Sequence, residues 1–229
     1  MINKIIFTIF FLTYFPSLAR SGGYDAGNGG LVLVCRAKYD RYGINKIQFY
    51  DMWYWSKEGL SPYSLTFRTD LKDYPQGTNL LVEELSQMVP QYAVDLVEEF
   101  EILKKLVEEY KAEYLKGYHF DYLSRTEDYG ERLAPRNFCN SEFDHPLEVA
   151  NIARYDQRNF FILSYLYFDA LSEIEKNGLI FHEVVYRVLE KYNLDKDEAF
   201  NTMEVTANML SNLPEEQKLQ NISKILLSK

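Results

Sequence analysis

Leu31-Val32-Leu33-Val34-Cys35 and Ile44-Asn45-Lys46-Ile47-Gln48-Phe49-Tyr50 are the two segments that decide the fold. The first is a short, continuous apolar run, which is typical of a buried strand. The second alternates, with Ile47 and Phe49 on one face, and predicts another strand. Because Tyr39-Asp40-Arg41-Tyr42-Gly43 between them is rich in turn-forming residues, the two segments predict a β-hairpin.

The chain after Asn79 has the pattern of a helical domain. From Gln91 to Leu115, apolar residues recur at three- and four-residue steps, with charged residues on the other side. Pro90 fits the first turn of this helix, and Gly117 fits its end. Other helical segments are predicted over 80–88, 146–155, 160–175, 179–191, 197–211 and 215–227. The 160–175 helix is apolar nearly all round, so we expect it in the centre of the core, with Gly178 breaking or capping it.

Residues 56–79 hold most of the turn formers of the mid-chain and predict a loop with one short strand near 64–68. The expected fold is therefore α+β and mainly α. An N-terminal β-hairpin and loop region (31–78) would pack on a helical domain (79–229), and together they would form one folded unit.

The N-terminal residues have the pattern of a cleaved signal peptide. Lys4 supplies the positive charge, and Ile5 to Phe15 form an apolar run broken only by two threonines. Pro16 ends the run, and Ser17-Leu18-Ala19 places small residues where a signal peptidase cleaves. The run is too short for a membrane-spanning helix. We therefore expect residues 1–19 to be removed and the rest to be exported, periplasmic or extracellular, with no membrane span after cleavage; an uncleaved N-terminal anchor is the alternative.

The mature chain would begin with a Gly-rich arm (20–30) and would be acidic. The whole sequence has 25 Lys and Arg against 34 Asp and Glu, and loss of Lys4 leaves 24 against 34. Because binding to phosphates needs clustered Lys and Arg, which the sequence lacks, we expect no nucleic-acid partner.

Cys35 and Cys139 are the only cysteines of the chain. In an oxidising compartment two cysteines most simply form one disulfide. The alternative is two free or metal-bound thiols. A Cys35–Cys139 bond would join the N-terminal strand to the middle of the chain and would stabilise the fold by about 4 kcal/mol in the chain-entropy model.

Phe181-His182-Glu183-Val184-Val185-Tyr186-Arg187 is the sharpest candidate for chemistry. It begins like the helix of zinc proteases, in which two histidines one turn apart bind the metal and a glutamate acts as the base. Tyr186 replaces the second histidine, and a neutral tyrosine is a poor zinc ligand. A site would need His182 to meet His145 and a carboxylate such as Asp144 or Glu142.

The same helix has a purely structural interpretation, which we favour. His182 would be hydrogen-bonded to Tyr186 beside an apolar stripe, and Glu183 and Arg187 would form an ion pair one turn apart. We therefore predict no metal and no cofactor. Catalysis by His182 and Glu183, with or without metal, is kept as the alternative.

The chain has 19 Tyr, 15 Phe and 2 Trp, with several of them between Tyr50 and Trp55. Exposed Trp53 and Trp55 would be suitable platforms for a protein surface or a sugar ring. Tyr186 and Arg187 are further candidate ligand-binding residues. The alternative is that these aromatic residues fill the core.

Two stretches together resemble a group of exported bacterial proteins of unknown function. The first runs from Gly27-Asn28-Gly29-Gly30 through the strand ending in Cys35, and continues to the second strand, which ends in Asp51. The second is the late His-Glu-x-x-Tyr-Arg helix, matched at 182–187. The resemblance implies export, a two-part layout and a helix that normally carries Tyr at position 186, but it implies no activity.

Two hypotheses follow for function. The first is a non-catalytic binding or structural module of the envelope or extracellular space, with a protein or an envelope glycan as partner. The second is a hydrolase-like enzyme. An enzyme should place His182 and Glu183 in an open pocket with His145, Asp144 or Arg154, whereas a binding module should bury His182 and expose Trp53 or Trp55.

Overall fold

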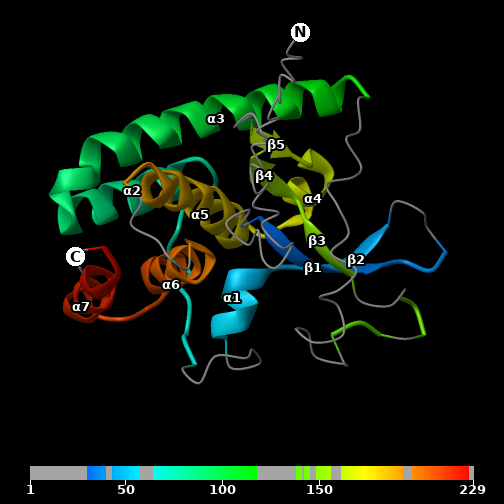
Figure 1. Ribbon diagram of the computed structural model, residues 1–229. Helices are drawn as coiled ribbons and strands as arrows, with labels where there is room; N and C mark the ends of the chain where they lie inside the picture. The colour runs from blue at the N-terminus through cyan, green and yellow to red at the C-terminus, as the bar shows by residue number, and fades with distance from the viewer. Residues whose placement is uncertain are drawn as a thin grey trace, which may run out of the picture.

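The computed structural model describes residues 30–39, 43–56, 64–117, 138–140, 142–144, 148–155, 161–192 and 198–226. The expected signal peptide and nearly all of the expected Gly-rich arm lie outside these residues. Within them the protein is α+β and mainly helical, as predicted, with a three-stranded sheet, a two-stranded sheet and seven α-helices (Figure 1).

The predicted hairpin is present. β1 (Leu31–Arg36) pairs antiparallel with β2 (Ile44–Phe49) on one edge and with β3 (Glu148–Asn151) on the other, which gives the strand order β2-β1-β3. The central place of β1 explains its continuous apolar sequence, because a strand covered on both faces has no polar side.

The two faces of β1 belong to two different clusters. Val32 and Val34 pack in the main core, whereas Leu33 and Cys35 face a smaller cluster that also contains Trp53. The alternation of side chains along a strand separates the two sets.

Residues 146–175 differ from the prediction. The expected helix over 146–155 is replaced by β3 and by β4 (Ala153–Tyr155), and the expected central helix over 160–175 is divided into β5 (Phe161–Leu163) and the short α4 (Tyr165–Ala170). β4 and β5 pair with each other. Pairing with the open edge of β1 satisfies backbone groups of residues 148–151 in a way that local helical preference does not anticipate.

Gly30, expected at the end of a flexible arm, is instead fixed against this second strand region. Its N–H donates to the carbonyl of Ala153 over 3.2 Å, and its carbonyl accepts from the N–H of Ile152 over 2.7 Å. A Cβ at Gly30 would lie 2.4 Å from the Cβ of Ala153, so only glycine fits this close approach.

The helices carry most of the remaining structure. They are α1 (Tyr50–Trp55), α2 (Gln76–Met88), a 3₁₀ turn (Pro90–Tyr92), α3 (Ala93–Leu115), α5 (Glu173–Tyr192), α6 (Glu198–Leu210) and α7 (Glu215–Leu226). The predicted segments over 80–88, 91–115, 197–211 and 215–227 are confirmed within a few residues. The strand expected near 64–68 is reduced to a single bridge between Phe67 and Ser211.

α5 is the central helix of the protein. It lies between α3 and α6 and also contacts α2, β2 and β4 (Figure 1). Almost every residue from Asn177 to Leu189 is buried. The prediction that Gly178 ends a helix is wrong, because α5 runs through it without a break. A Cβ there would lie 2.7 Å from Cδ1 of Leu210 and 3.3 Å from Cε1 of Phe49, so glycine allows α6 and β2 to approach α5 closely.

Cys35 and Cys139 form a disulfide, with the two Cα atoms 5.5 Å apart and 104 residues between them in sequence. The bond attaches residues 138–140 to β1. None of the helices in the described part of the chain combines the length and the apolar character that a membrane crossing requires.

Gly178→Ala should destabilise the fold by about 1 kcal/mol. Overpacking against Leu210 and Phe49 costs roughly 1–3 kcal/mol, while alanine recovers about 1 kcal/mol of helix propensity. Urea denaturation of both proteins would measure the difference. In a Leu210→Ala background the same change should cost less, because the closest neighbour has been removed. A Gly178→Ala protein as stable as wild type would contradict the close-approach argument.

Candidate functional site

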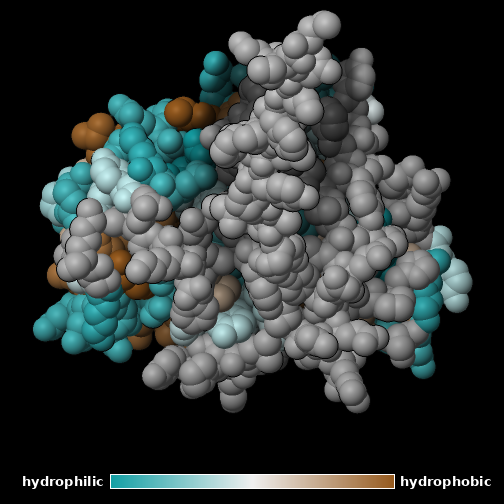
Figure 2. Space-filling model, in the orientation of Figure 1, coloured by the Kyte–Doolittle hydropathy of each residue, from teal (hydrophilic) through white to brown (hydrophobic). Residues whose placement is uncertain are grey.

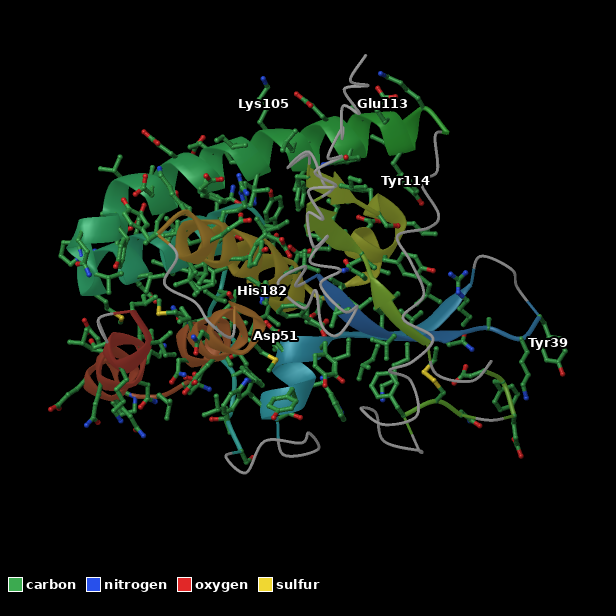
Figure 3. The ribbon with its side chains drawn as sticks, in the orientation of Figure 1. Tyr39, Asp51, Lys105, Glu113, Tyr114 and His182 are labelled. Atoms are coloured by element: carbon green, nitrogen blue, oxygen red, sulfur yellow. A yellow bond between two sulfur atoms is a disulfide. The ribbon has the colours of Figure 1, made fainter. Side chains whose placement is uncertain are left out.

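The candidate site is a buried hydrogen-bonded pair of Asp51 and His182, which joins α1 to α5. Oδ2 of Asp51 lies 2.5 Å from Nδ1 of His182, and the two side chains are 4% and 2% exposed. Figure 3 shows the two residues facing each other where α5 passes α1. His182 therefore has Asp51 as its partner, not Tyr186 as expected.

Glu175 lies on the same face of α5 as His182 and holds the end of β2. Its Oε1 accepts a hydrogen bond from the backbone N–H of Phe49 over 3.0 Å, and its Oε2 accepts from the backbone N–H of Ser172 over 3.0 Å and from the Ser172 hydroxyl. Glu175, Gly178 and His182 are three and four residues apart, so they share one face of α5. This face holds the end of β2, and Asp51 follows two residues later.

The ring of His182 is enclosed by apolar groups on one side. Phe49 meets it edge-on, with 6.2 Å between the ring centroids. Nε2 of His182 is buried and has no hydrogen-bond partner among the described residues. A buried imidazole with one nitrogen fixed by a carboxylate keeps its orientation.

Glu183 is the second predicted catalytic residue, and it is fully buried next to the pair. Neither carboxylate oxygen has a hydrogen-bond partner within the part of the chain that the structure describes. Burial raises the pKa of Glu183 to about 8, and the charge of Asp51 adds to this rise, while His182 and Arg187 oppose it. Glu183 is therefore protonated at neutral pH.

The pKa of His182 is also raised above its ordinary value. Burial alone would lower it, but the charge of Asp51 and the hydrogen bond to Asp51 outweigh burial. The raised pKa of His182 favours the charged imidazole beside Asp51, and the raised pKa of Glu183 favours the neutral carboxyl group. The second shift reduces the charge that is buried at this site, as the cost of burying an unpaired charge requires.

Within the part of the chain that the structure describes, His182 belongs to no group of three side chains that could hold a metal ion. Among the described residues, the only group of three whose ligand atoms lie within 4.8 Å of one another is Cys35, Cys139 and Asp144, and its two cysteines form the disulfide. His119, His145 and the side chain of Arg154 lie outside the described residues.

Asp144 has a separate structural role close to the disulfide. Its Oδ1 accepts from the side-chain amide of Asn45 over 2.6 Å, and its Oδ2 accepts from the backbone N–H of Asn140 over 2.6 Å. It also bridges to Ala37 at the end of β1.

The predicted ligand-binding aromatics do not form an exposed platform. Trp53 is 1% exposed and Trp55 is 6% exposed. Tyr186 is buried as well. Nη1 of Arg187 donates to Glu190 over 2.6 Å, and its Nε lies 3.9 Å from Oε2 of Glu99, while the Glu183 oxygens accept no hydrogen bond from the described residues. Burial of α1 against β1 and α6 accounts for the tryptophans, because the helix fills the space beside the smaller cluster.

Sequence reasoning missed Asp51 and Glu175 as partners. Asp51 can be identified from the sequence as the residue that ends the second strand segment. Nothing in the sequence indicates that it contacts His182, which lies 131 residues later. Glu175 sits in the first turn of α5, where an acidic residue is also expected from the helix dipole alone.

Two grooves are present elsewhere on the described surface, and neither is lined by His182 or Glu183. The larger one, about 470 Å³, is called the Arg68 groove here. It lies between residues 68–70, the residues Glu84, Gln87 and Met88 of α2, and the corner from Ser211 to Lys218 that joins α6 to α7. The smaller, about 390 Å³, lies beside α2 and α3 and includes Lys72, Glu83 and Lys104.

Backbone pairing holds the walls of the Arg68 groove together. The N–H of Arg68 donates to the carbonyl of Leu210 over 2.8 Å, and the N–H of Asn212 donates to the carbonyl of Thr66 over 2.8 Å. The side-chain amide of Asn212 adds a hydrogen bond to the carbonyl of Phe67 over 2.7 Å. The groove is thus built on fixed backbone.

Comparison of the chain with family models, with curated proteins and with solved structures gives no match. The site is therefore interpreted from its own geometry.

The stability of the protein should fall as pH rises from 5 to 9. Glu183 keeps its proton up to about pH 8 in the folded state, but in the unfolded chain it loses the proton near its ordinary value of 4.5. Between these pH values only the folded state binds the proton, so the free energy of unfolding falls as pH rises. The total decrease is about a few kcal/mol. The raised pKa of His182 acts in the same direction.

Glu183→Gln removes one of these titrations. Urea denaturation at several pH values should show a flatter pH dependence for this variant, with a gain over wild type at pH 8.5. Glu98→Gln, a change of an exposed carboxylate, is the matched control and should follow wild type. Equal slopes for Glu183→Gln and wild type would show that Glu183 is not protonated in the folded protein.

Proposed function

We propose that the chain is an exported, non-catalytic binding protein and that its ligand site is the Arg68 groove. The observation that carries this proposal is the contrast between two parts of the molecule. The residues predicted to be catalytic are sealed in the core, at 2% exposure for His182 and 0% for Glu183, while a polar groove large enough for a small ligand is built elsewhere.

Export rests on the N-terminal pattern around Lys4 and Ser17-Leu18-Ala19. The Cys35–Cys139 disulfide supports it, since such bonds persist in oxidising compartments.

The polar character of the visible surface favours a polar ligand and does not favour an apolar protein partner. On the face shown in Figure 2, hydrophilic residues dominate the region over α3 and α7, and the apolar spots are separate. Exposed apolar residues of α3, such as Val94 and Ile102, stand among charged neighbours such as Glu98, Glu101 and Lys105. Scattered apolar residues of this kind are normal on a protein surface.

Native mass spectrometry tests the location of the binding site. The mature protein is incubated with a small-molecule extract of the envelope of its producing cells, and bound masses are recorded. Gln87→Trp, which fills the groove from an exposed position on α2, should lose the bound mass. Gln220→Trp, exposed on α7 outside the groove, and Glu183→Gln should keep it. Binding by Gln87→Trp at the wild-type level would overturn the proposal.

A hydrolase-like enzyme is the second candidate, and one observation favours it. Asp51 holds Nδ1 of His182, and Nε2 has no hydrogen-bond partner within the described residues and lies near the carboxyl group of Glu183, which is a familiar arrangement for acid–base chemistry. Burial of both groups argues against it, because a reacting atom must reach them.

Metal content separates the two candidates. Mature protein purified without chelator should contain no stoichiometric zinc, in wild type and in His182→Ala alike, by plasma mass spectrometry. One zinc per chain that is lost in His182→Ala, and kept in the exposed control Gln220→Trp, would favour the enzyme and would direct the next assays to hydrolysis.

A further inference from the structure

Lys218 is an unusual residue in the Arg68 groove. It lies in the first turn of α7, lines the groove, and is only 7% exposed. Its Nζ donates to the carbonyl of Met209 over 3.2 Å. No carboxylate oxygen of the described residues forms an ion pair with it, so an ammonium with three donors has one protein acceptor in the described part of the chain.

Arg68, the other cation of the groove, is by contrast fully neutralised. Its Nε and Nη2 donate to the two oxygens of Asp70 over 3.0 and 3.1 Å, and its Nη1 donates to Glu84 over 2.7 Å. Its side chain is 11% exposed. The two carboxylates fix the guanidinium as part of the wall.

The charges of the groove are arranged by depth. Burial lowers the pKa of Lys218, and the positive charge of Arg68 lowers it further, while Glu84, Asp70 and Glu215 oppose the change. Lys218 is thus an incompletely neutralised cation inside the groove. Asp70, 67% exposed, and Glu215, at the exposed start of α7, place negative charge at the rim.

We propose that the Arg68 groove binds a zwitterion, a free amino acid or short peptide, with its carboxylate on Lys218 and its ammonium between Asp70 and Glu215. This inference rests on the proposed function and names its ligand class. A carboxylate supplies the acceptors that Nζ of Lys218 lacks, and charge-assisted hydrogen bonds of this kind are strong when water is excluded. The ammonium of the ligand is needed as well. The groove has three carboxylates (Asp70, Glu84 and Glu215) and two cations (Arg68 and Lys218), so its net negative charge would repel a ligand that is only an anion.

The volume agrees with this class of ligand. About 470 Å³ is within the usual range for small-molecule sites and accommodates a dipeptide. Thr69, Ser211 and Asn212 provide further polar groups along the wall.

Isothermal titration calorimetry of the mature protein tests the inference with three probes: the dipeptide Ala-Ala, its N-acetyl form and its C-terminal amide. Ala-Ala should bind, and blocking either end should weaken binding about tenfold or more, since each block removes one charged contact. Lys218→Met, which keeps the stem and removes the charge, should lose Ala-Ala binding. Lys224→Met, exposed on the same helix, is the matched control and should bind like wild type.

Lys218→Met changes a buried residue and could lose binding because it fails to fold. Glu215→Gln is a second test of the same site at an exposed residue, where a folding defect is not expected. It should weaken Ala-Ala severalfold and leave the N-acetyl dipeptide unchanged. Equal binding of all three probes, or wild-type binding by Lys218→Met, would overturn the inference.

The disaccharide N,N′-diacetylchitobiose is the fourth probe, and it separates the two proposals. Binding of this neutral ligand without Ala-Ala, lost in Gln87→Trp, would overturn the zwitterion and keep the groove as the binding site. Binding of none of the four probes would also overturn the zwitterion. If Gln87→Trp in addition left the native mass spectrum unchanged, the proposed function would fall too.

Discussion

The structure depends on one face of α5, where Glu175, Gly178 and His182 meet the junction between β2 and α1. Each makes a different kind of contact: a carboxylate on a backbone N–H, a close approach without a side chain, and a buried hydrogen-bonded pair. Together they fasten the N-terminal hairpin to the helical part. Replacement of Glu175 or His182 would leave a buried polar group without its partner. A larger residue at Gly178 would overfill the contact between α5 and the junction of β2 and α1, because protein interiors are closely packed.

Much of the fold could be predicted from the sequence, and the limits have clear physical causes. The hairpin and the helices over 91–115, 197–211 and 215–227 carry their own periodicity, so local pattern is enough. β3, β4 and β5 do not, because β3 pairs with β1, which is more than a hundred residues away in sequence, and β4 and β5 are short strands that pair with each other. The local sequence predicts a helix end at Gly178, because the residues that require a glycine there, Leu210 and Phe49, are distant in the chain.

The candidate site shows the same division. His182 and Glu183 could be identified from their types and spacing, whereas their burial and the partner Asp51 could not. The motif resembles a metalloprotease helix only along the chain. In space its histidine faces a carboxylate and a phenyl ring, and its glutamate faces the core. The Arg68 groove left almost no signal in sequence, since its walls come from a connecting segment, from α2 and from the corner between α6 and α7.

The strand order β2-β1-β3 has a consequence for the way the chain is made. The ribosome synthesises β1 and β2 early, whereas β3 begins 112 residues after the end of β1, and α5 follows later still. Until then one edge of β1 has no strand to pair with, and Asp51 has no histidine. The nascent N-terminal half is therefore a poor folding unit by itself and a good client for chaperones that cover exposed strand edges.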